Sequence, residues 1–181
     1  MPMLNIEKTA LIIIDVQEKL SRVMHEKEKL FENLQKLIKG VQILSIPIVV
    51  TEQNPNGLGP TVSEIAPLLT DTKAVTKFSF SCCGEEPFLR KIEKLNRKQI
   101  LLTGIETHVC VYQTAVDLIE AGYEVHTVVD CVSSRTTENK TLALDKMKSE
   151  GARLTSVEIV LFELLKTAAN PKFKELSKIV K

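Results

Sequence analysis

The stretch "LLTGIETHVCVYQTAVDL", residues 101–118, runs as a short apolar segment to Gly104 and then continues with apolar residues at helical spacing. A buried strand followed closely by a helix is the repeating unit of α/β proteins. Cys110 falls on the first turn of the expected helix. A thiol in this position has two interpretations: it is a small buried hydrophobe, or it is a nucleophile favoured by the helix N-terminus.

The rest of the chain repeats this alternation. Apolar, β-branched runs predict strands at 9–15, 46–52 and 99–104, and weaker runs predict strands at 73–77, 123–130 and 153–157. Helical periodicity falls at 27–44, 85–95, 108–121, 137–149 and 157–167. Near-continuous apolar strands are typical of a sheet covered on both faces. We therefore expect an α/β fold, a doubly wound three-layer sandwich whose mostly parallel sheet of about six strands is flanked by helices and built through right-handed crossovers.

Length and composition limit the possible functions. The 181 residues fit one domain, 1–181, and the 24 basic and 23 acidic residues give a net charge of +1. This balance does not favour nucleic acid as a partner, and no apolar run reaches the ~20 residues of a membrane span. The N-terminus lacks the pattern of a signal peptide. We expect a cytoplasmic protein with reduced cysteines.

Glycines near helix ends and one long loop interrupt the predicted strands and helices. Gly40, Gly122 and Gly151 fall near expected helix ends, where a left-handed residue closes the last turn. Residues 53–70 are rich in Pro and Gly and form a long loop beside a strand end. In open α/β sheets, ligands bind outside the carboxyl ends of the strands, so this loop is expected near the site.

Three residues that could carry chemistry, Asp15, Lys77 and Cys110, each fall at the carboxyl end of a different predicted strand. A parallel sheet brings such positions to one edge, where they supply a base, a cation and a nucleophile. Singly, each has an ordinary alternative: a capping aspartate, a solvated lysine and a packed thiol. Thr107 is the expected N-cap of the helix that carries Cys110.

Four motifs, "ALIIIDVQEKL", "TEQNPNGLGPTVSEI", "TKFSFSC" and "LLTGIETHVCVYQTAVDLIEAGYEVHTVVDCVSSR", resemble the isochorismatase-like cysteine hydrolase superfamily and look most like its isochorismatase domain-containing subgroup. The resemblance extends from about residue 9 to about residue 162. It implies a catalytic triad of Asp15, Lys77 and Cys110. It also implies a cis peptide between Ile105 and Glu106, with an oxyanion hole from the N–H groups of Glu106 and Cys110.

Departures from the family pattern narrow the chemistry. Metal-binding members carry histidines after the second strand, where this chain has "TEQNPNGLGPTV", and His25, His108 and His126 are too far apart for a metal motif. We expect no metal and no cofactor. True isochorismatases lack the cysteine, so Cys110 indicates covalent chemistry on a small amide or related acyl compound. A silent binding or scaffold protein, and a hydrolase of an ester or vinyl ether, stay open as alternatives.

Further residues are assigned by their place beside these motifs. The expected substrate-binding residues are Gln17, Leu58, Phe78, Phe80 and Tyr112. Cys82 and Cys83 follow Lys77 closely without an expected role. The family analogy implies a homo-oligomer, a dimer or larger, and the apolar helix at 156–168 is one candidate contact. Core packing gives the same apolar pattern.

Overall fold

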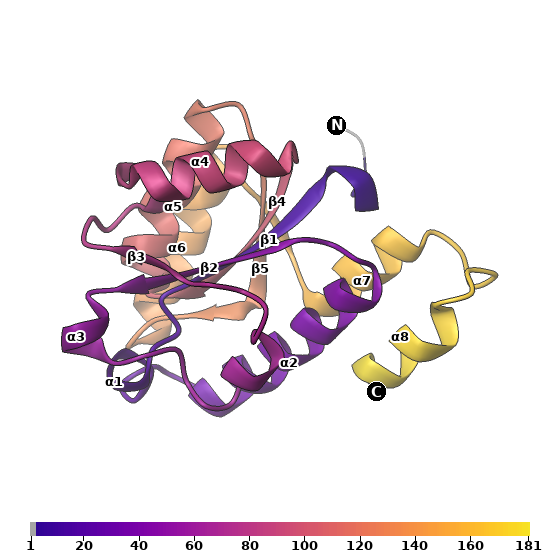
Figure 1. Cartoon of the computed structure of the whole chain (residues 1–181), viewed down its shortest axis with the longest axis horizontal. Coiled ribbons are helices and arrows are strands. Elements are labelled where there is room, and N and C mark those ends of the chain that lie inside the picture. Colours follow the sequence, from indigo (N-terminus) through magenta and orange to yellow (C-terminus); the bar gives the residue numbers. More distant parts are fainter. Residues whose placement is uncertain (1–2) are drawn as a thin grey trace.

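A computed structural model of the chain describes residues 3–181. Its centre is a six-stranded sheet in the order β3-β2-β1-β4-β5-β6, and every neighbouring pair is parallel (Figure 1). The strands are β1 (Thr9–Ile14), β2 (Ile48–Gln53), β3 (Val75–Lys77), β4 (Gln99–Ile105), β5 (Glu124–Ser133) and β6 (Arg153–Thr155). The predicted doubly wound α/β sandwich is confirmed.

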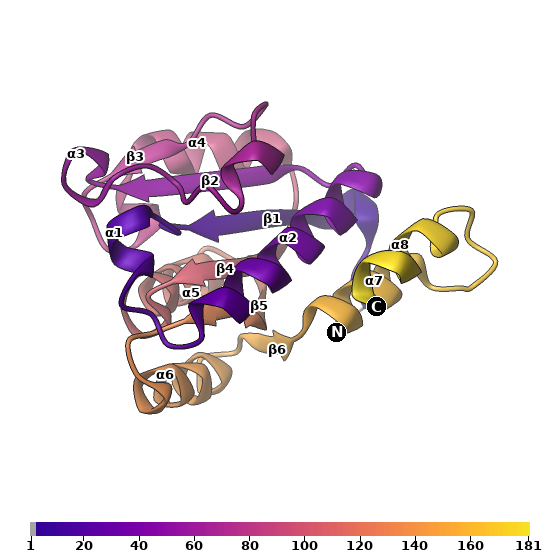
Figure 2. The ribbon, with the colours of Figure 1, turned by 90° about the horizontal axis from the view of Figure 1, so that it is seen from below.

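Helices cover both faces of this sheet (Figure 2). They are α1 (Glu18–Ser21), α2 (Lys27–Ile43), α3 (Pro55–Leu58), α4 (Glu86–Leu95), α5 (Tyr112–Glu120), α6 (Thr137–Ser149), α7 (Val157–Leu165) and α8 (Phe173–Val180). A π-helical turn at Thr107–Val111 precedes α5, and 3₁₀ turns lie at Ile6–Lys8, Ala66–Leu68 and Cys82–Gly84. Helix α8 has no counterpart in the sequence prediction.

The side chains of β1 alternate between two cores. Leu11 and Ile13 pack with α2, α7 and α8, whereas Ile12 and Ile14 pack with α4 and α5 on the other face. All six residues of β1 are buried, as expected for a central parallel strand. The sheet therefore separates the molecule into two apolar layers, and its strand ends form the edge where polar groups gather.

The glycine prediction was right at two positions and wrong at the third. Gly122 and Gly151 have positive φ angles of 80° and 105° and follow α5 and α6. Gly40 lies inside α2 instead, where a Cβ atom would stand 2.5 Å from Cδ2 of Leu161. Close packing of α2 on α7 explains this glycine, and the helix continues to Ile43.

Gly104 fixes the path of the chain into the candidate site. Its φ is 115°, and a Cβ atom there would stand 2.1 Å from the carbonyl oxygen of Ile14. Only glycine allows β4 to run this close to the end of β1. The strand order reverses between β1 and β4, which is the switch point where α/β proteins bind ligands.

Candidate active site

Asp15 leaves β1 with a left-handed φ of 51° and is fully buried. Its Oδ1 accepts a 2.7 Å hydrogen bond from Thr51 Oγ1, and its Oδ2 lies 2.7 Å from Lys77 Nζ. Burial raises the pKa of the Asp15 carboxyl, and the Lys77 charge offsets this only in part. The Asp15 carboxylate therefore binds a proton more readily than a solvent-exposed aspartate does.

Lys77 ends β3 and is also fully buried. Besides Asp15, its Nζ donates to Gln53 Oε1 at 2.7 Å and to the carbonyls of Ser79 and Phe80, each at 3.0 Å. Burial lowers the pKa of Lys77, but the nearby Asp15 carboxylate and two thiols outweigh this, so the net pKa is raised. The ammonium stays charged and is held in a fixed direction.

Cys110 lies in the π-helical turn and its residue is 5% exposed. Its Sγ lies 3.6 Å from Gln53 Oε1, the atom that also accepts from Lys77. Burial raises the pKa of the thiol to about 12, the Asp15 charge adds to this, and Lys77 opposes it. Burial thus favours a neutral thiol at Cys110, next to the Asp15 carboxylate.

Thr107 does not cap the helix as predicted. Glu106 occupies the residue before the π-helical turn, and no side chain caps it. Thr107 is fully buried, and its Oγ1 has no hydrogen-bond partner within residues 3–181. The π-helical turn, absent from the sequence prediction, replaces the regular first turn around Cys110.

The sequence analysis missed Gln53, which connects the lysine to the thiol. It is the last residue of β2 and pairs in register with Lys77. Its Nε2 donates to the Phe78 carbonyl at 3.0 Å, while Oε1 meets both Lys77 and Cys110. Gln53 does belong to the quoted "TEQNPNGLGPTVSEI" motif and begins the 53–70 loop that was expected near the site.

Gln17 secures Gln53 from the other side. Gln17 Oε1 accepts from the Gln53 backbone N–H at 2.8 Å, and Nε2 donates to the carbonyls of Gln53 at 2.9 Å and Gly59 at 2.7 Å. Gln17 is fully buried. Its amide therefore ties the loop after β2 to the end of β1, which is a structural role, while a direct contact with substrate stays a prediction.

The peptide bond between Ile105 and Glu106 is cis. The Glu106 carboxylate accepts a 3.0 Å charged hydrogen bond from Nε of Arg135, which follows β5. His108 Nδ1 lies 3.0 Å from Ser134 Oγ in the same segment. Arg135 is a second residue that the sequence analysis did not single out, although it belongs to the quoted "CVSSR" motif.

The other expected substrate-binding residues lie on segments that lead to or from this cluster. Phe78 and Phe80 are 70% and 55% exposed, and their backbone carbonyls bind Gln53 and Lys77. Leu58 ends α3, and Tyr112 begins α5 with Lys146 Nζ 4.8 Å from its ring centre. The two exposed rings thus lie on the segment that holds Lys77 in place.

Two other thiols lie near the site, and the charges of Asp15 and Lys77 act on Cys82 as they do on Cys110. Cys82 is fully buried with Sγ 3.8 Å from Thr51 Oγ1, and burial raises its pKa to about 12. Cys83 is half-buried, and burial raises its pKa to about 11. Across residues 3–181, no group of three His, Cys, Asp or Glu side chains could hold a metal ion.

A parallel sheet with polar groups gathered at its switch point defines a doubly wound α/β protein with a candidate ligand site at the strand ends. The chain belongs to the isochorismatase family, because the Isochorismatase domain model matches residues 9–159. The family expected from the motifs is confirmed.

Two curated relatives and one solved structure extend this assignment. The chain is 40% identical to "Secreted isochorismatase effector Isc1" of Phytophthora sojae, over 96% of this chain and 84% of the relative. It is 40% identical to "Isochorismatase domain-containing protein 2" of Xenopus laevis, over 95% and 83%. The solved structure of MAR1 ribonuclease from Caenorhabditis elegans superposes with a TM-score of 0.93 at 38% identity, over 99% of this chain and 92% of that one.

Proposed function

We propose that the protein is a metal-independent cysteine hydrolase that cleaves a small amide or related acyl compound through a thioester at Cys110. The observation that supports this most is the 2.7 Å contact between two fully buried charges, Asp15 and Lys77, beside the Cys110 thiol. An isolated buried ion pair contributes little to stability, so a fold has little structural reason to place one next to a thiol. Perturbed titratable groups in such a cluster are typical of active sites.

In the first half of the reaction, Asp15 takes the thiol proton as Cys110 Sγ attacks the carbonyl carbon. A thiol with a pKa of about 12 is protonated at rest, so proton transfer accompanies the attack. Backbone N–H groups of Glu106 and Cys110 hold the tetrahedral oxyanion. The carbon–nitrogen bond then breaks, and the amine leaves with the proton from Asp15.

In the second half, water attacks the thioester carbonyl as Asp15 takes one of its protons. The carbon–sulfur bond then breaks, Asp15 returns the proton to the sulfur, and the acid leaves with the free thiol restored. Lys77 holds the Asp15 carboxylate in a fixed orientation and stabilises the negative charge that develops on the sulfur. Gln53 accepts from Lys77 through the same oxygen that contacts Cys110, so it aligns these two groups. The exposed Phe78 and Phe80 rings supply apolar contacts for the substrate.

The test is a panel of small amides, with the matched esters and a vinyl ether, incubated with the natural protein and Cys110→Ser. Trapping with acid followed by mass spectrometry detects an acyl group on the peptide that contains Cys110. We expect amide turnover and an acylated peptide in the natural protein alone. Turnover of esters or vinyl ethers only, or equal turnover by Cys110→Ser, would contradict the amide thioester mechanism.

A ribonuclease activity is not proposed, although the worm protein of known structure is called a ribonuclease. The 24 basic and 23 acidic residues leave almost no net charge to attract a phosphate backbone. Single-stranded RNA therefore serves as a control in the same panel. Absence of turnover on every substrate would favour the binding or scaffold protein.

A homo-oligomer remains a prediction. Most apolar residues of α7 are buried against α2 and α8 within one chain, which leaves Ile159 and Phe162 as its exposed apolar side chains. Light scattering at several concentrations tests the assembly. No helix in residues 3–181 is long and apolar enough to cross a membrane, and a cytoplasmic location also remains a prediction.

A further inference from the structure

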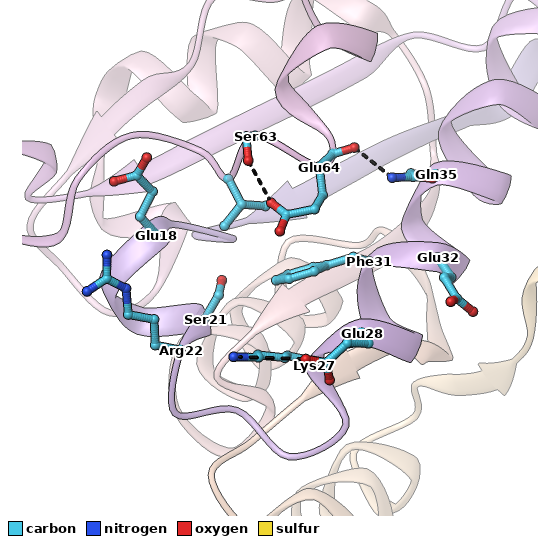
Figure 3. Close-up of a pocket in the computed structure, with 11 residues that line it drawn as sticks. Glu18, Ser21, Arg22, Lys27, Glu28, Phe31, Glu32, Gln35, Ser63 and Glu64 are labelled. Carbon is cyan, nitrogen blue, oxygen red and sulfur yellow. Dashed lines mark hydrogen bonds and ion pairs between the residues drawn. The ribbon is translucent and has the colours of Figure 1, made fainter.

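A cavity lies on the α2 face of the sheet, and none of the candidate active-site residues lines it. Its volume is about 540 Å³, and it is lined by α1, α2 and residues 62–64 (Figure 3). This volume is in the range of small-molecule sites. Its lining residues Phe31 and Val62 belong to the core around α2, whereas Cys110 belongs to the core on the opposite face.

The floor of the cavity is buried and incompletely satisfied. Phe31, Val62 and Ser21 are 8%, 4% and 2% exposed. Ser21 Oγ has no hydrogen-bond partner among the described residues, and Figure 3 shows it directed toward the space beside the Phe31 ring. A buried hydroxyl without a partner costs free energy, so a ligand that bonds to it gains affinity.

The rim of the cavity is negatively charged. Four carboxylates line it against two cations, a formal balance of −2; they are Glu18, Glu28, Glu32 and Glu64 against Arg22 and Lys27. Lys27 lies 3.9 Å from Glu28. The Glu64 carboxylate lies close to the Phe31 ring in Figure 3 and accepts from Ser63 Oγ at 3.1 Å. The excess of carboxylates favours a cation.

We propose that this cavity binds a small organic amine whose ammonium lies between Ser21 Oγ, the Glu64 carboxylate and the face of Phe31, and whose apolar body packs on Phe31 and Val62. The ammonium donates one N–H to the Ser21 hydroxyl oxygen and another to the Glu64 carboxylate. The aromatic ring adds cation–π attraction. An anion meets the excess of carboxylates, and a neutral molecule gains only the apolar contact.

Neighbouring hydrogen bonds hold the cavity walls in place. Val62 N–H donates to the Val16 carbonyl at 3.0 Å, and Gln35 Nε2 donates to the Glu64 carbonyl at 2.8 Å. These bonds join the segment after β2 to the end of β1 and to α2. The backbone of the cavity walls is therefore fixed before a ligand arrives, and binding requires a shift of side chains that opens a path to Ser21 Oγ, which is shielded from solvent.

The probe is phenethylamine, compared with 2-phenylethanol and 3-phenylpropanoate, in nitrogen–proton correlation spectra of the full chain. We expect saturable chemical-shift changes at Ser21, Phe31 and Val62 when phenethylamine is added. 2-Phenylethanol should bind at least fivefold more weakly, and 3-phenylpropanoate should not bind. Ser21→Ala and Glu64→Gln should each weaken amine binding at least threefold. Glu175→Gln, on the exposed side of α8, makes the same chemical change away from the cavity and should bind normally.

Protein alkylated at Cys110 should bind the amine unchanged, so this result is independent of the proposed hydrolase activity. The proposal fails if the amine and the alcohol bind equally, or if shifts cluster around Cys110 instead. It also fails if Glu64→Gln behaves like Glu175→Gln. Binding should weaken as salt is raised from about 50 to about 500 mM, because the rim charges are exposed to solvent.

Discussion

Cys110 and Cys131 are both buried thiols, but their surroundings differ. Cys131 lies within β5 in the core around α2, and burial raises its pKa well above the usual value. Burial also raises the pKa of Cys110, yet Asp15, Lys77 and Gln53 surround that thiol. Burial is therefore the main cause of the high pKa of both sulfurs. Asp130 and Lys140 act on Cys131 only through their charges, whereas Asp15, Lys77 and Gln53 also contact the Cys110 thiol.

The largest effect should come from replacing each thiol by alanine. Cys110→Ala removes the nucleophile, and we expect turnover to fall by about 10⁴-fold or more. Cys131→Ala leaves the proposed triad untouched and should keep turnover within about twofold. Steady-state rates on the best amide of the panel measure both. Equal losses in the two variants would mean that the comparison reflects folding and not chemistry.

The second largest effect should be a loss of folding stability when the ion pair beside Cys110 is broken. Lys77→Met leaves the Asp15 carboxylate buried without its partner, a change that typically costs about 3–5 kcal/mol. Lys174→Met changes an exposed lysine on α8 and should stay within about 0.5 kcal/mol. Urea unfolding measures both free energies.

A double variant separates the ion pair from the packing around it. Adding Asp15→Asn to Lys77→Met removes the stranded charge and should recover part of the loss. Full recovery is not expected, because the carbonyls of Ser79 and Phe80 still lack the lysine donor. Strictly additive losses would show that the two charges do not interact.

The third prediction separates the rate at which the Cys110 thiol is alkylated from the rate at which the protein turns over substrate. With a pKa of about 12, alkylation by iodoacetamide should rise about tenfold per pH unit from about pH 7 to about pH 10. The Asp15 charge raises this pKa, so Asp15→Asn lowers it and speeds alkylation severalfold while turnover collapses. Lys77→Met acts in the opposite direction on alkylation.

Peptide mass spectrometry resolves each cysteine in that experiment. Cys83 is the internal control, because burial and Asp117, not Asp15, raise its pKa. Its rate should not change between the variants. A plateau of Cys110 alkylation near neutral pH, or slower alkylation in Asp15→Asn, would mean that the natural thiol is already ionised.

The sheet was predictable because its central strands are near-continuous apolar runs. The predicted ends of β1 and β4 lie within one residue of the observed ends, and α6 matches throughout. Helix α8 was missed because it is short and comes after the alternating pattern. Gly40 was misinterpreted because its need for a small side chain depends on Leu161, which is 121 positions away in the sequence.

The candidate site was predictable only in part, for a similar reason. Strand ends identified Asp15 and Lys77, and these side chains do meet in the structure. The role of Gln53 depends on its register with Lys77, and the contact of Arg135 with Glu106 joins two different loops. Neither a register nor a contact between loops is visible in a local pattern of residues. The neutral state of Cys110 likewise follows from desolvation by the folded chain.

The smallest expected effect is on the free energy of unfolding. Here the order of the two thiols is reversed, and replacing Cys131 should cost more than replacing Cys110. Cys131→Ala leaves a small void in a closed core and should lower the free energy of unfolding by about 1–2 kcal/mol. Cys110→Ala should lower it by less, about 0.5 kcal/mol, because Cys110 is 5% exposed and lies beside the polar Asp15, so water can fill the space that the thiol leaves. Urea titrations at neutral pH measure the pair. If Cys110→Ala were the more destabilising of the two, that sulfur would be a packing element first, and the binding or scaffold protein would become the better account of the site.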